Sequence, residues 1–498
     1  FRSAEQIVSH LNSKKRSAHS NAAADSGLIG SAVNIYKKSY DKEFGGFGSA
    51  PKFPAPHNLL FLMTYYEKHG DKDTLEMAEK TLVQMYKGGL FDHIGYGFCR
   101  YSTDRFFLVP HFEKMLYDNA LLILAYCKAY RITGKHIYLH IAEKTATYIL
   151  REMTAPEGGF CCAQDADSDG VEGKYYLFTP SEIIGLLGED AGKAFNEYYG
   201  ISRHGNFEGQ NIPNLLHGKA SEVGIKNVRK VYEYRRQRNS LRLDDKILTS
   251  WNSLTISAMC MLYRISSKKI YLDAAANAER FITERLCDGD ALFAVYRRGV
   301  RGQNGFLDDY AYYIYALLSL YESTLDIIYL KKAETFCGKT ITAFYDKKYS
   351  GFYFSTSGGE KLIINPKETY DGALPSGNSV MAYNLVRLSL ITGADHYYDI
   401  AKKQLDFMYA EARQYPVGYS MFLIALSDYF NPPPKITAVL SKKDDLNKIS
   451  LTPPHDTILT VLTAPTADYP LLNEKTTFYV CKGRSCLPPV NDLREIPL

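Results

Sequence analysis

A repeated pattern of paired amphipathic helices runs through most of this 498-residue chain. Apolar residues recur there with the 3.6-residue period of a helix that buries one face. Short breaks such as His69-Gly70-Asp71 and Thr133-Gly134-Lys135 join the two members of a pair, and longer loops separate the pairs. The pattern predicts twelve helices, over residues 27–39, 58–69, 72–87, 113–132, 135–152, 251–266, 268–287, 307–324, 327–345, 379–392, 395–411 and 416–428.

The longer loops share glycines that are followed by an aromatic residue, as in Gly45-Gly46-Phe47, Gly158-Gly159-Phe160 and Gly351-Phe352. Together with the helix pairs they form a degenerate internal repeat. Six helical hairpins can close into a ring, with the short turns at one end and the long polar loops at the other. In such a ring the inner helices are buried on all sides, which explains their nearly all-round apolar character. We therefore predict a mainly α fold, an (α/α)6 toroid, over residues 27–430.

The helical pattern ends after Tyr429. The run Asn431-Pro-Pro-Pro434 stops the last helix. Short β-like runs follow at residues 436–440, 457–462 and 476–481. We expect residues 431–498 to form a small α/β region appended to the toroid.

Composition excludes several classes of protein. The net charge of +4 is small for this length, whereas a nucleic-acid-binding protein carries a concentrated basic face. No apolar run approaches membrane-spanning length, and no signal peptide opens the sequence, which begins at Phe1. The nine cysteines are scattered, mostly in apolar helical runs, which is typical of reduced, intracellular proteins. We expect a cytoplasmic protein that has neither a nucleic acid nor a membrane as partner.

The most unusual stretch runs from Pro110 to Leu122, where a loop leads into a helix. Its polar residues are packed too densely for an ordinary helix entry, and Asp118 stands directly before an apolar run. Polar groups near a core must find partners or a cavity. A polar cavity at the mouth of a helix is a candidate small-molecule site. The residues concerned are His111, Glu113, Lys114, Tyr117 and Asp118.

Other long loops supply further candidate acids and bases. His57, His93 and His111 can transfer protons near neutral pH. The carboxylate pairs 244/245 and 308/309 could do acid–base work on a sugar, although each can equally be a helix cap or a first-turn acid favoured by the helix dipole. All these loops would converge at one mouth of the ring.

The sequence offers no strong metal or cofactor motif. The run Asp165-Ala-Asp-Ser-Asp-Gly170 begins like a calcium loop, but the twelfth position is Tyr176 instead of a bidentate Glu, so an acidic turn or a group of carboxylates lining the cavity is favoured. Cys481 and Cys486 are too few for a structural zinc site and are expected to be buried or loosely paired thiols. No Walker loop or dinucleotide fingerprint is present. We expect neither a metal nor a cofactor.

Several sequence motifs are specific enough to indicate a family. The sequence resembles the spermatogenesis-associated protein 20 family over most of residues 27–490. The strings are Phe91-Asp92-His93, Arg100-Tyr101-Ser102-Thr103-Asp104, Val109-Pro110-His111-Phe112-Glu113-Lys114-Met115-Leu116-Tyr117-Asp118, Asp165-Ala166-Asp167-Ser168 and Leu243-Asp244-Asp245-Lys246.

The resemblance implies an architecture and a partner. Members of the family look like a thioredoxin-like domain joined to an (α/α)6 barrel that is similar to N-acylglucosamine 2-epimerases and six-hairpin glycosidases. The thioredoxin-like portion is absent here. We therefore expect residues 1–26 to be the connection to that domain, which would be the partner of the barrel in the full-length protein.

Two positions depart from the family pattern. Cys99 and Arg242 stand where members usually carry histidine. The loss of two proton carriers puts an epimerase-like mechanism in doubt, or moves it to His57, His93 and His111.

Three functions remain open. The first is a sugar epimerase or isomerase that uses His111 and His93 as base and acid, with Arg100 and Lys246 stabilising oxyanion charge and Trp251 stacking on the sugar together with Tyr117. The second is a glycosidase that uses Asp167 and Asp245. The third is a non-catalytic ligand-binding or scaffold barrel that serves the thioredoxin-like domain. The predicted catalytic residues are His111, His93, Asp167, Asp245 and Lys246, and the predicted substrate-binding residues for a sugar-like ligand are His57, Arg100, Tyr101, Glu113, Tyr117, Asp118, Asp165, Trp251 and Asp309.

Overall fold

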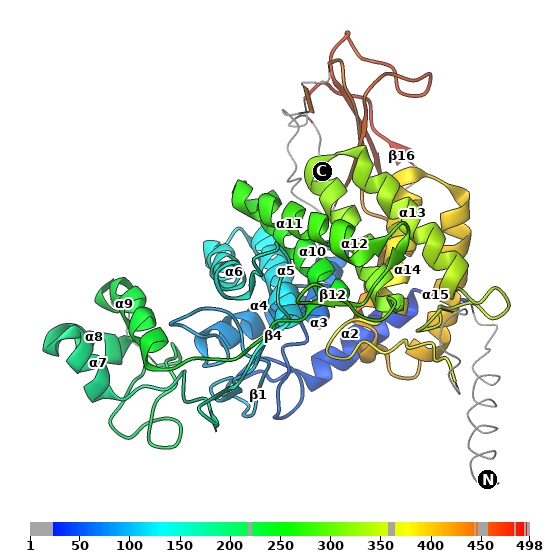
Figure 1. Ribbon diagram of the computed structural model, residues 1–498. Helices are drawn as coiled ribbons and strands as arrows, with labels where there is room; N and C mark the ends of the chain where they lie inside the picture. The colour runs from blue at the N-terminus through cyan, green and yellow to red at the C-terminus, as the bar shows by residue number, and fades with distance from the viewer. Residues whose placement is uncertain are drawn as a thin grey trace, which may run out of the picture.

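The computed structural model shows a ring of helices with a small sheet at one end and a group of short helices at one side (Figure 1). It describes residues 23–217, 222–356, 364–442, 445–446, 457–482, 485–492 and 495. The expected connection, residues 1–26, therefore lies almost wholly outside the described residues. In the part of the chain that is described, no helix is long and apolar enough to cross a membrane.

Six inner helices form the wall of the ring, and each packs against the next until the last meets the first. Their faces are buried nearly all round, as expected for the inside of a toroid. They are α3 (Pro56–His69), α5 (Leu116–Thr133), α10 (Thr249–Ser266), α12 (Leu307–Thr324), α14 (Gly377–Thr392) and α16 (Ser420–Phe430).

Six outer helices cover the inner ones, and the ring confirms the predicted (α/α)6 fold. The turns that join inner to outer helices are short. After α5, for example, Gly134 adopts φ +68° and its N–H bonds to the Tyr130 carbonyl at 2.8 Å, a helix end that favours glycine. The outer helices are α2 (Gly27–Ser39), α4 (Lys72–Lys87), α6 (His136–Tyr148), α11 (Lys269–Phe281), α13 (Ile327–Phe344) and α15 (Asp395–Ala412). Single π-helical turns, η1 (Ile149–Met153) and η2 (Ile282–Leu286), extend α6 and α11, and η3 (Pro416–Gly418) precedes α16.

Short strands replace the predicted start of one helix. The sequence pattern placed a helix over residues 113–132, but α5 begins at Leu116. The residues before it pair instead as β2 (Pro110–His111) with β1 (Tyr101–Ser102), and as β3 (Lys114–Met115) with β4 (Ala163–Gln164). β4 also pairs with β7 (Leu243–Asp244). The motif that leads into α5 is therefore tied by backbone hydrogen bonds to two distant loops.

Further two- and three-residue strands build the loop end of the ring. They are β5 (Asp167–Ser168), β6 (Val171–Glu172), β8 (Ile247–Leu248), β9 (Cys287–Asp288), β10 (Ala291–Leu292), β11 (Val295–Arg297) and β12 (Val300–Arg301).

Three helices between α6 and α10 were not predicted. They are α7 (Pro180–Leu187), α8 (Glu189–Tyr198) and α9 (Glu222–Arg238), and they stand to one side of the ring (Figure 1). They share a small apolar core that includes Phe178, Phe195 and Val231. Arg235 of α9 reaches from this insertion into the barrel.

The C-terminal residues form a four-stranded sheet of order β14-β13-β15-β16. The strands are β13 (Lys435–Val439), β14 (Ile458–Leu462), β15 (Thr477–Lys482) and β16 (Ser485–Cys486), which confirms the three strands predicted from sequence. β13 runs parallel to β14 and antiparallel to β15.

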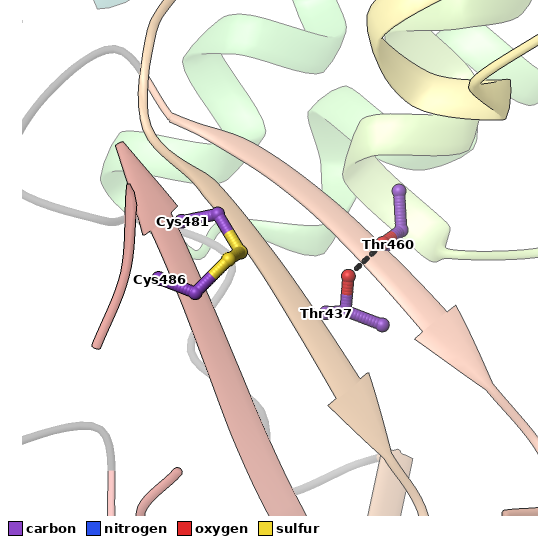
Figure 2. The surroundings of a disulfide bond; sticks show 4 residues. All are labelled: Thr437, Thr460, Cys481 and Cys486. Carbon is purple, nitrogen blue, oxygen red and sulfur yellow. Dashed lines mark hydrogen bonds between the residues drawn. A yellow bond between two sulfur atoms is a disulfide. The ribbon is translucent and has the colours of Figure 1, made fainter. Parts of the chain in front are cut away.

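Two cysteines of this sheet are joined. Cys481 and Cys486 face each other across β15 and β16 and form a disulfide (Figure 2). The expectation of two thiols is therefore wrong: the antiparallel register places their Cα atoms 4.0 Å apart. On the neighbouring strands Thr437 and Thr460 share a hydrogen bond of 3.1 Å.

Candidate functional site

A cavity of about 550 Å³ opens at the end of the ring where the long loops lie. We call it the loop-end cavity. Its walls come from α2, from the loop between α2 and α3, from the starts of α3 and α5, and from the loops before α14 and α16. It is lined by Tyr36, Ser39, Phe47, Gly48, Phe53, Pro54, Ala55, His57, Asn58, Tyr117, Asp118, Tyr370, Asp371, Gly372, Ala373, Tyr415 and Val417.

His57 lies in the first turn of α3 and is 2% exposed. Burial lowers the pKa of its imidazole to about 4, so the ring is neutral near pH 7. Its Nδ1 atom is buried and has no hydrogen-bond partner among the residues that the structure describes, and the same holds for Oδ1 of Asn58. The turn that presents both side chains contains Ala55 at φ +36°, a left-handed backbone that costs energy for a residue with a Cβ.

Asp118 lies in the first turn of α5 and is 4% exposed. Burial raises the pKa of its carboxyl well above the ordinary value, which favours the protonated form. Its Oδ2 atom has no hydrogen-bond partner in the described part of the chain. Tyr117 interacts with this carboxyl and with the Arg100 guanidinium. A ligand in the cavity would therefore meet a neutral acid beside a neutral imidazole.

The loop before α14 carries a second carboxylic acid of the lining. Asp371 is 4% exposed, and burial raises the pKa of its carboxyl to about 6. Its two oxygens accept hydrogen bonds from the backbone N–H groups of Ser376 at 2.9 Å and Met421 at 2.8 Å. These contacts fix the loops before α14 and α16 against each other, so Asp371 shapes the cavity.

Exposed aromatic rings stand among the lining residues. Phe53, Tyr370 and Tyr415 are 53%, 58% and 55% exposed. Phe53 stacks on Tyr101 at 4.7 Å between ring centroids, and Tyr101 stacks on His111 at 5.3 Å. Open aromatic faces beside buried polar groups suit a ligand that has both apolar and hydroxyl surfaces.

A chain of polar contacts leads from the cavity to His111. The Arg100 guanidinium pairs with the Glu113 carboxylate at 3.0 Å, and Glu113 Oε2 lies 3.8 Å from His111 Nε2. The other ring nitrogen of His111 lies 2.6 Å from Glu172 Oε1. His111 is therefore held between two carboxylates beside the cavity and is absent from its lining.

A second hollow, of about 340 Å³, lies beside the sheet formed by β3, β4 and β7. We call it the rim basin. Its charged lining balances three acids against three bases, and Lys246 pairs with Asp244 at 3.0 Å. It is lined by Glu113, Ala163, Asp165, Arg242, Asp244, Lys246 and Arg297. Arg242 therefore lines the rim basin and is absent from the lining of the loop-end cavity.

His93 lies away from both hollows. It is 3% exposed, its Nε2 is 3.2 Å from the Gly88 carbonyl, and its ring packs against Tyr86, Phe91 and Tyr199. Burial lowers the pKa of the imidazole to about 4. These contacts describe a packed core histidine, and Cys99 nearby is likewise buried.

The two proposed glycosidase acids also lie outside both linings. Asp245 is held by Arg297 at 2.5 Å and Arg298 at 2.7 Å. Asp167 is exposed on β5, where it pairs in register with Glu172. Asp165 and Asp167 thus belong to an acidic surface turn.

Asp309 acts as a helix cap. Its oxygens accept from the N–H groups of Phe306 at 2.9 Å and Ser250 at 3.1 Å, and burial raises the pKa of its carboxyl to about 7. Trp251, in the first turn of α10, is half-buried and meets the edge of Tyr117 at 4.8 Å.

The sequence analysis named His57, Tyr117 and Asp118 of this lining and missed the others, including Asn58, Tyr370, Asp371 and Tyr415. Asn58 directly follows a predicted site histidine. In the run Tyr370-Asp371-Gly372 the acid followed by glycine was the available signal. Among the described residues no three His, Cys, Asp or Glu side chains are grouped so that they could hold a metal ion.

Comparison with known proteins gives relatives at the sequence level. Spermatogenesis-associated protein 20 of Homo sapiens is 30% identical in an alignment that covers 92% of this chain and 67% of that protein. The protein of the same name from Rattus norvegicus is 33% identical, over 78% of this chain and 56% of its own length. The chain thus spans between about half and two thirds of these relatives. No family model matches it.

Solved structures with a similar fold are distant in sequence. Cellobiose 2-epimerase from Bacillus thermoamylovorans B4167 has a TM-score of 0.53 and 12% identity, covering 80% of this chain and 98% of that one. A D-mannose isomerase also has a TM-score of 0.53, with 11% identity over 76% of this chain and 84% of its own. At these identities the likeness establishes the shared fold, which both sugar-converting enzymes use.

Proposed function

The chain belongs to the spermatogenesis-associated protein 20 family, and from this premise we propose that its barrel binds a sugar or sugar-like polyol in the loop-end cavity and transfers a proton on it. The (α/α)6 fold is one that sugar epimerases and isomerases use. The substrate and the reaction are our inference from the cavity itself.

The observation that carries the proposal is a set of three buried polar atoms without partners. They are His57 Nδ1, Asn58 Oδ1 and Asp118 Oδ2, and all belong to residues that line one cavity. An unpaired buried polar atom costs about 1–3 kcal/mol. Several hydroxyl groups on one ligand can satisfy such a set, and the exposed rings of Phe53, Tyr370 and Tyr415 offer faces for the ligand's C–H surface.

The protonation states suit acid–base work. His57, whose pKa burial lowers to about 4, is a neutral base near pH 7. Asp118, whose pKa burial raises, keeps a proton that it can give. In the proposed step His57 takes the proton from the carbon next to a carbonyl, and Asp118 returns a proton to that carbon. His57 ends protonated and Asp118 ionised, and exchange with water restores both.

The other two functions have weaker support. A glycosidase needs two free carboxyl groups across one cavity, whereas both oxygens of Asp245 are bound by arginines. A purely binding barrel would use the same cavity without turnover, so the experiment below separates it from an isomerase. A thioredoxin-like partner domain stays a prediction.

The test is a screen of aldoses, ketoses, N-acylated sugars and polyols by thermal shift, followed by NMR of each hit in D2O. We expect deuterium uptake at one carbon, abolished by Asp118→Asn and by His57→Asn and retained by His93→Asn, which alters a histidine outside the cavity. Binding of a sugar without deuterium uptake would favour the non-catalytic binding barrel over an isomerase. No binding by any sugar, or uptake that survives both substitutions, would overturn the proposal.

A further inference from the structure

The disulfide between Cys481 and Cys486 lies at the edge of the C-terminal sheet, because β16 is the last strand on that side (Figure 2). Cys486 is exposed and Cys481 is half-buried, so a molecule in solvent can reach the bridge. We propose that this disulfide is a thiol–disulfide exchange site that accepts two electrons from a dithiol. The inference is independent of the sugar site, because it concerns other residues.

The other seven cysteines of the chain are free thiols, and six of them are buried. Burial raises the pKa of all seven thiols, for example to about 11 at Cys161 and to about 12 at Cys260. A thiol that keeps its proton and is shielded from solvent exchanges poorly. The bonded pair is therefore where sulfur exchange with an outside molecule is expected.

The fold of the sheet does not depend on this bridge. β13 pairs with β14 and with β15 over five residues each, and one face of the sheet packs in an apolar core that includes Ile436, Leu459 and Phe478. The two cysteines are only five positions apart, and a disulfide that closes a short loop stabilises a fold least. The bridge can therefore open and close with little change in the rest of the sheet.

The register of the strands places a cation beside the bridge. Lys435 of β13 pairs with Cys481, which pairs with Cys486, so the three side chains form one row on one face of the sheet. Lys435 Nζ donates to the Ile391 carbonyl at 3.0 Å, and no carboxylate pairs with it in the described part of the chain. A nearby positive charge stabilises a thiolate. Lys435 therefore favours release of the Cys481 sulfur when the bridge opens.

The proposed exchange takes two steps. One thiolate of the dithiol attacks the sulfur of Cys486, the more exposed cysteine; the S–S bond breaks, and Cys481 leaves as a thiolate. The second thiolate of the dithiol then attacks its own sulfur in the mixed disulfide, and Cys486 leaves as a thiolate. The dithiol is oxidised to a disulfide, the pair is reduced to two thiols, and the two protons pass through water from the dithiol to the cysteines.

The geometry selects a dithiol over a monothiol. After a monothiol has attacked Cys486, the Cys481 thiolate stays opposite the mixed disulfide on the paired strand and can attack it, which expels the monothiol. A dithiol completes the reaction because its own second sulfur is equally close. The co-substrate class is therefore a dithiol, carried by a small molecule or by a protein.

The first measurement follows the redox state of the pair in the whole chain. Dithiothreitol and glutathione are added at equal thiol concentration, and free thiols are trapped by alkylation and located by mass spectrometry. We expect dithiothreitol to open the pair in the folded protein, oxidised dithiothreitol to close it again, and glutathione to open it far more slowly. A reduced peptide with two cysteines, tested in parallel, shows whether a protein or a small dithiol reacts faster. A pair that opens only in denaturant, or equally fast with both thiols, would overturn the proposal.

The second measurement tests which sulfur is attacked. Cys481→Ser and Cys486→Ser each leave one thiol of the pair, and dithionitrobenzoate reports its reactivity. We expect Cys486 in the first variant to react several times faster than Cys481 in the second, because it is the more exposed. Cys481→Ser/Cys486→Ser gives the background of the seven other cysteines, and a signal of more than one extra thiol reveals a variant that has unfolded. Equal rates, or no reaction above background in folded protein, would contradict the proposed exchange.

Discussion

At the scale of single residues, burial sets which groups of the loop-end cavity hold a proton. His57 and Asp118 are both nearly inaccessible, so each prefers its neutral form, and this preference reverses the protonation that the two groups have in water near pH 6. Acid and base roles follow from the environment of the two side chains.

The pH dependence of proton exchange on a bound sugar follows from this pair. The rate should rise as pH increases through about 4, where His57 loses its proton, and should fall at higher pH, where Asp118 ionises. Initial rates of deuterium uptake between about pH 3.5 and 9 would measure both limbs. A rising limb near pH 6.5, the ordinary pKa of histidine, would contradict a buried base.

The same carboxyl makes stability depend on pH. The pKa of the Asp118 carboxyl is higher in the native protein than in the unfolded chain. The carboxyl's contribution to the free energy of unfolding is therefore complete below about pH 4 and is lost as pH rises toward the native pKa. Relative to Asp118→Asn, the wild-type free energy of unfolding should therefore fall by about 1.4 kcal/mol per pH unit over that window. Urea denaturation of both proteins between pH 4 and 7 checks this, and parallel pH curves would show that the carboxyl is solvated.

Sequence patterns located part of this site. Asp118 stood out because a carboxyl preceded an apolar helix face, and the structure places it on the cavity wall. His57 and His93 looked alike in sequence, since each stands in a Gly- or Pro-rich loop. Only the fold distinguishes them: His57 begins an inner helix, whereas His93 points into a cluster of rings.

At the scale of elements, a buried charge cluster attaches the α7–α9 insertion to the ring. Arg235 of α9 is 2% exposed and binds both oxygens of Asp92, at 2.9 and 2.8 Å. Lys114 of β3 binds the same carboxylate at 2.8 Å, and Tyr175 packs over the guanidinium. The lysine of the motif before α5 thus serves this attachment.

Substitution of Arg235 should loosen the insertion. Arg235→Leu removes one partner of a buried pair and should lower the free energy of unfolding by about 3–5 kcal/mol. The side chain of its neighbour Arg236 is 54% exposed. Arg236→Leu should therefore change the free energy of unfolding by no more than about 0.5 kcal/mol. Chemical denaturation of each variant measures the free energy of unfolding, and limited proteolysis at residues 180–238 measures how far the insertion has loosened. Equal effects of the two substitutions would mean that the buried cluster does not hold the insertion.

The disulfide should act locally on the edge of the C-terminal sheet. It closes a short loop between β15 and β16, and loop-closure entropy for such a loop is worth about 2 kcal/mol. In Cys481→Ser/Cys486→Ser we expect faster amide exchange in residues 477–486 and unchanged exchange in α5 and α10. Exchange that accelerates throughout the ring would show that the sheet stabilises the whole barrel.

Elements with a clear apolar period were predictable, and those held by polar contacts were not. The twelve helices of the ring can be predicted from sequence because each has one apolar face or is apolar on all faces. In helix α9 eight of the 17 residues are charged, and its attachment depends on Arg235, whose partner Asp92 is 143 positions away. The two-residue strands before α5 likewise depend on pairing with distant loops.

At the scale of the whole molecule, the toroid separates two kinds of chemistry along its axis. Loops gather at the starts of the inner helices and form the loop-end cavity, which is large and ringed by aromatic residues. Toward the other end of the ring lies a smaller cavity of about 120 Å³, whose lining includes Lys128, Arg131, Arg264, Glu322 and Arg387. The repeat predicted that one end would collect the polar loops, but the set of residues from different hairpins that line one cavity has no local signature in the sequence.

The most direct test of the account is the position of a bound sugar. A crystal structure of the barrel soaked with the tightest-binding sugar from the screen should show ligand hydroxyls within hydrogen-bond distance of His57 Nδ1, Asn58 Oδ1 and Asp118 Oδ2, with the ring against Phe53, Tyr370 or Tyr415. A sugar that binds in the rim basin, or a loop-end cavity in which those three atoms hold only water at saturating ligand, would contradict the account.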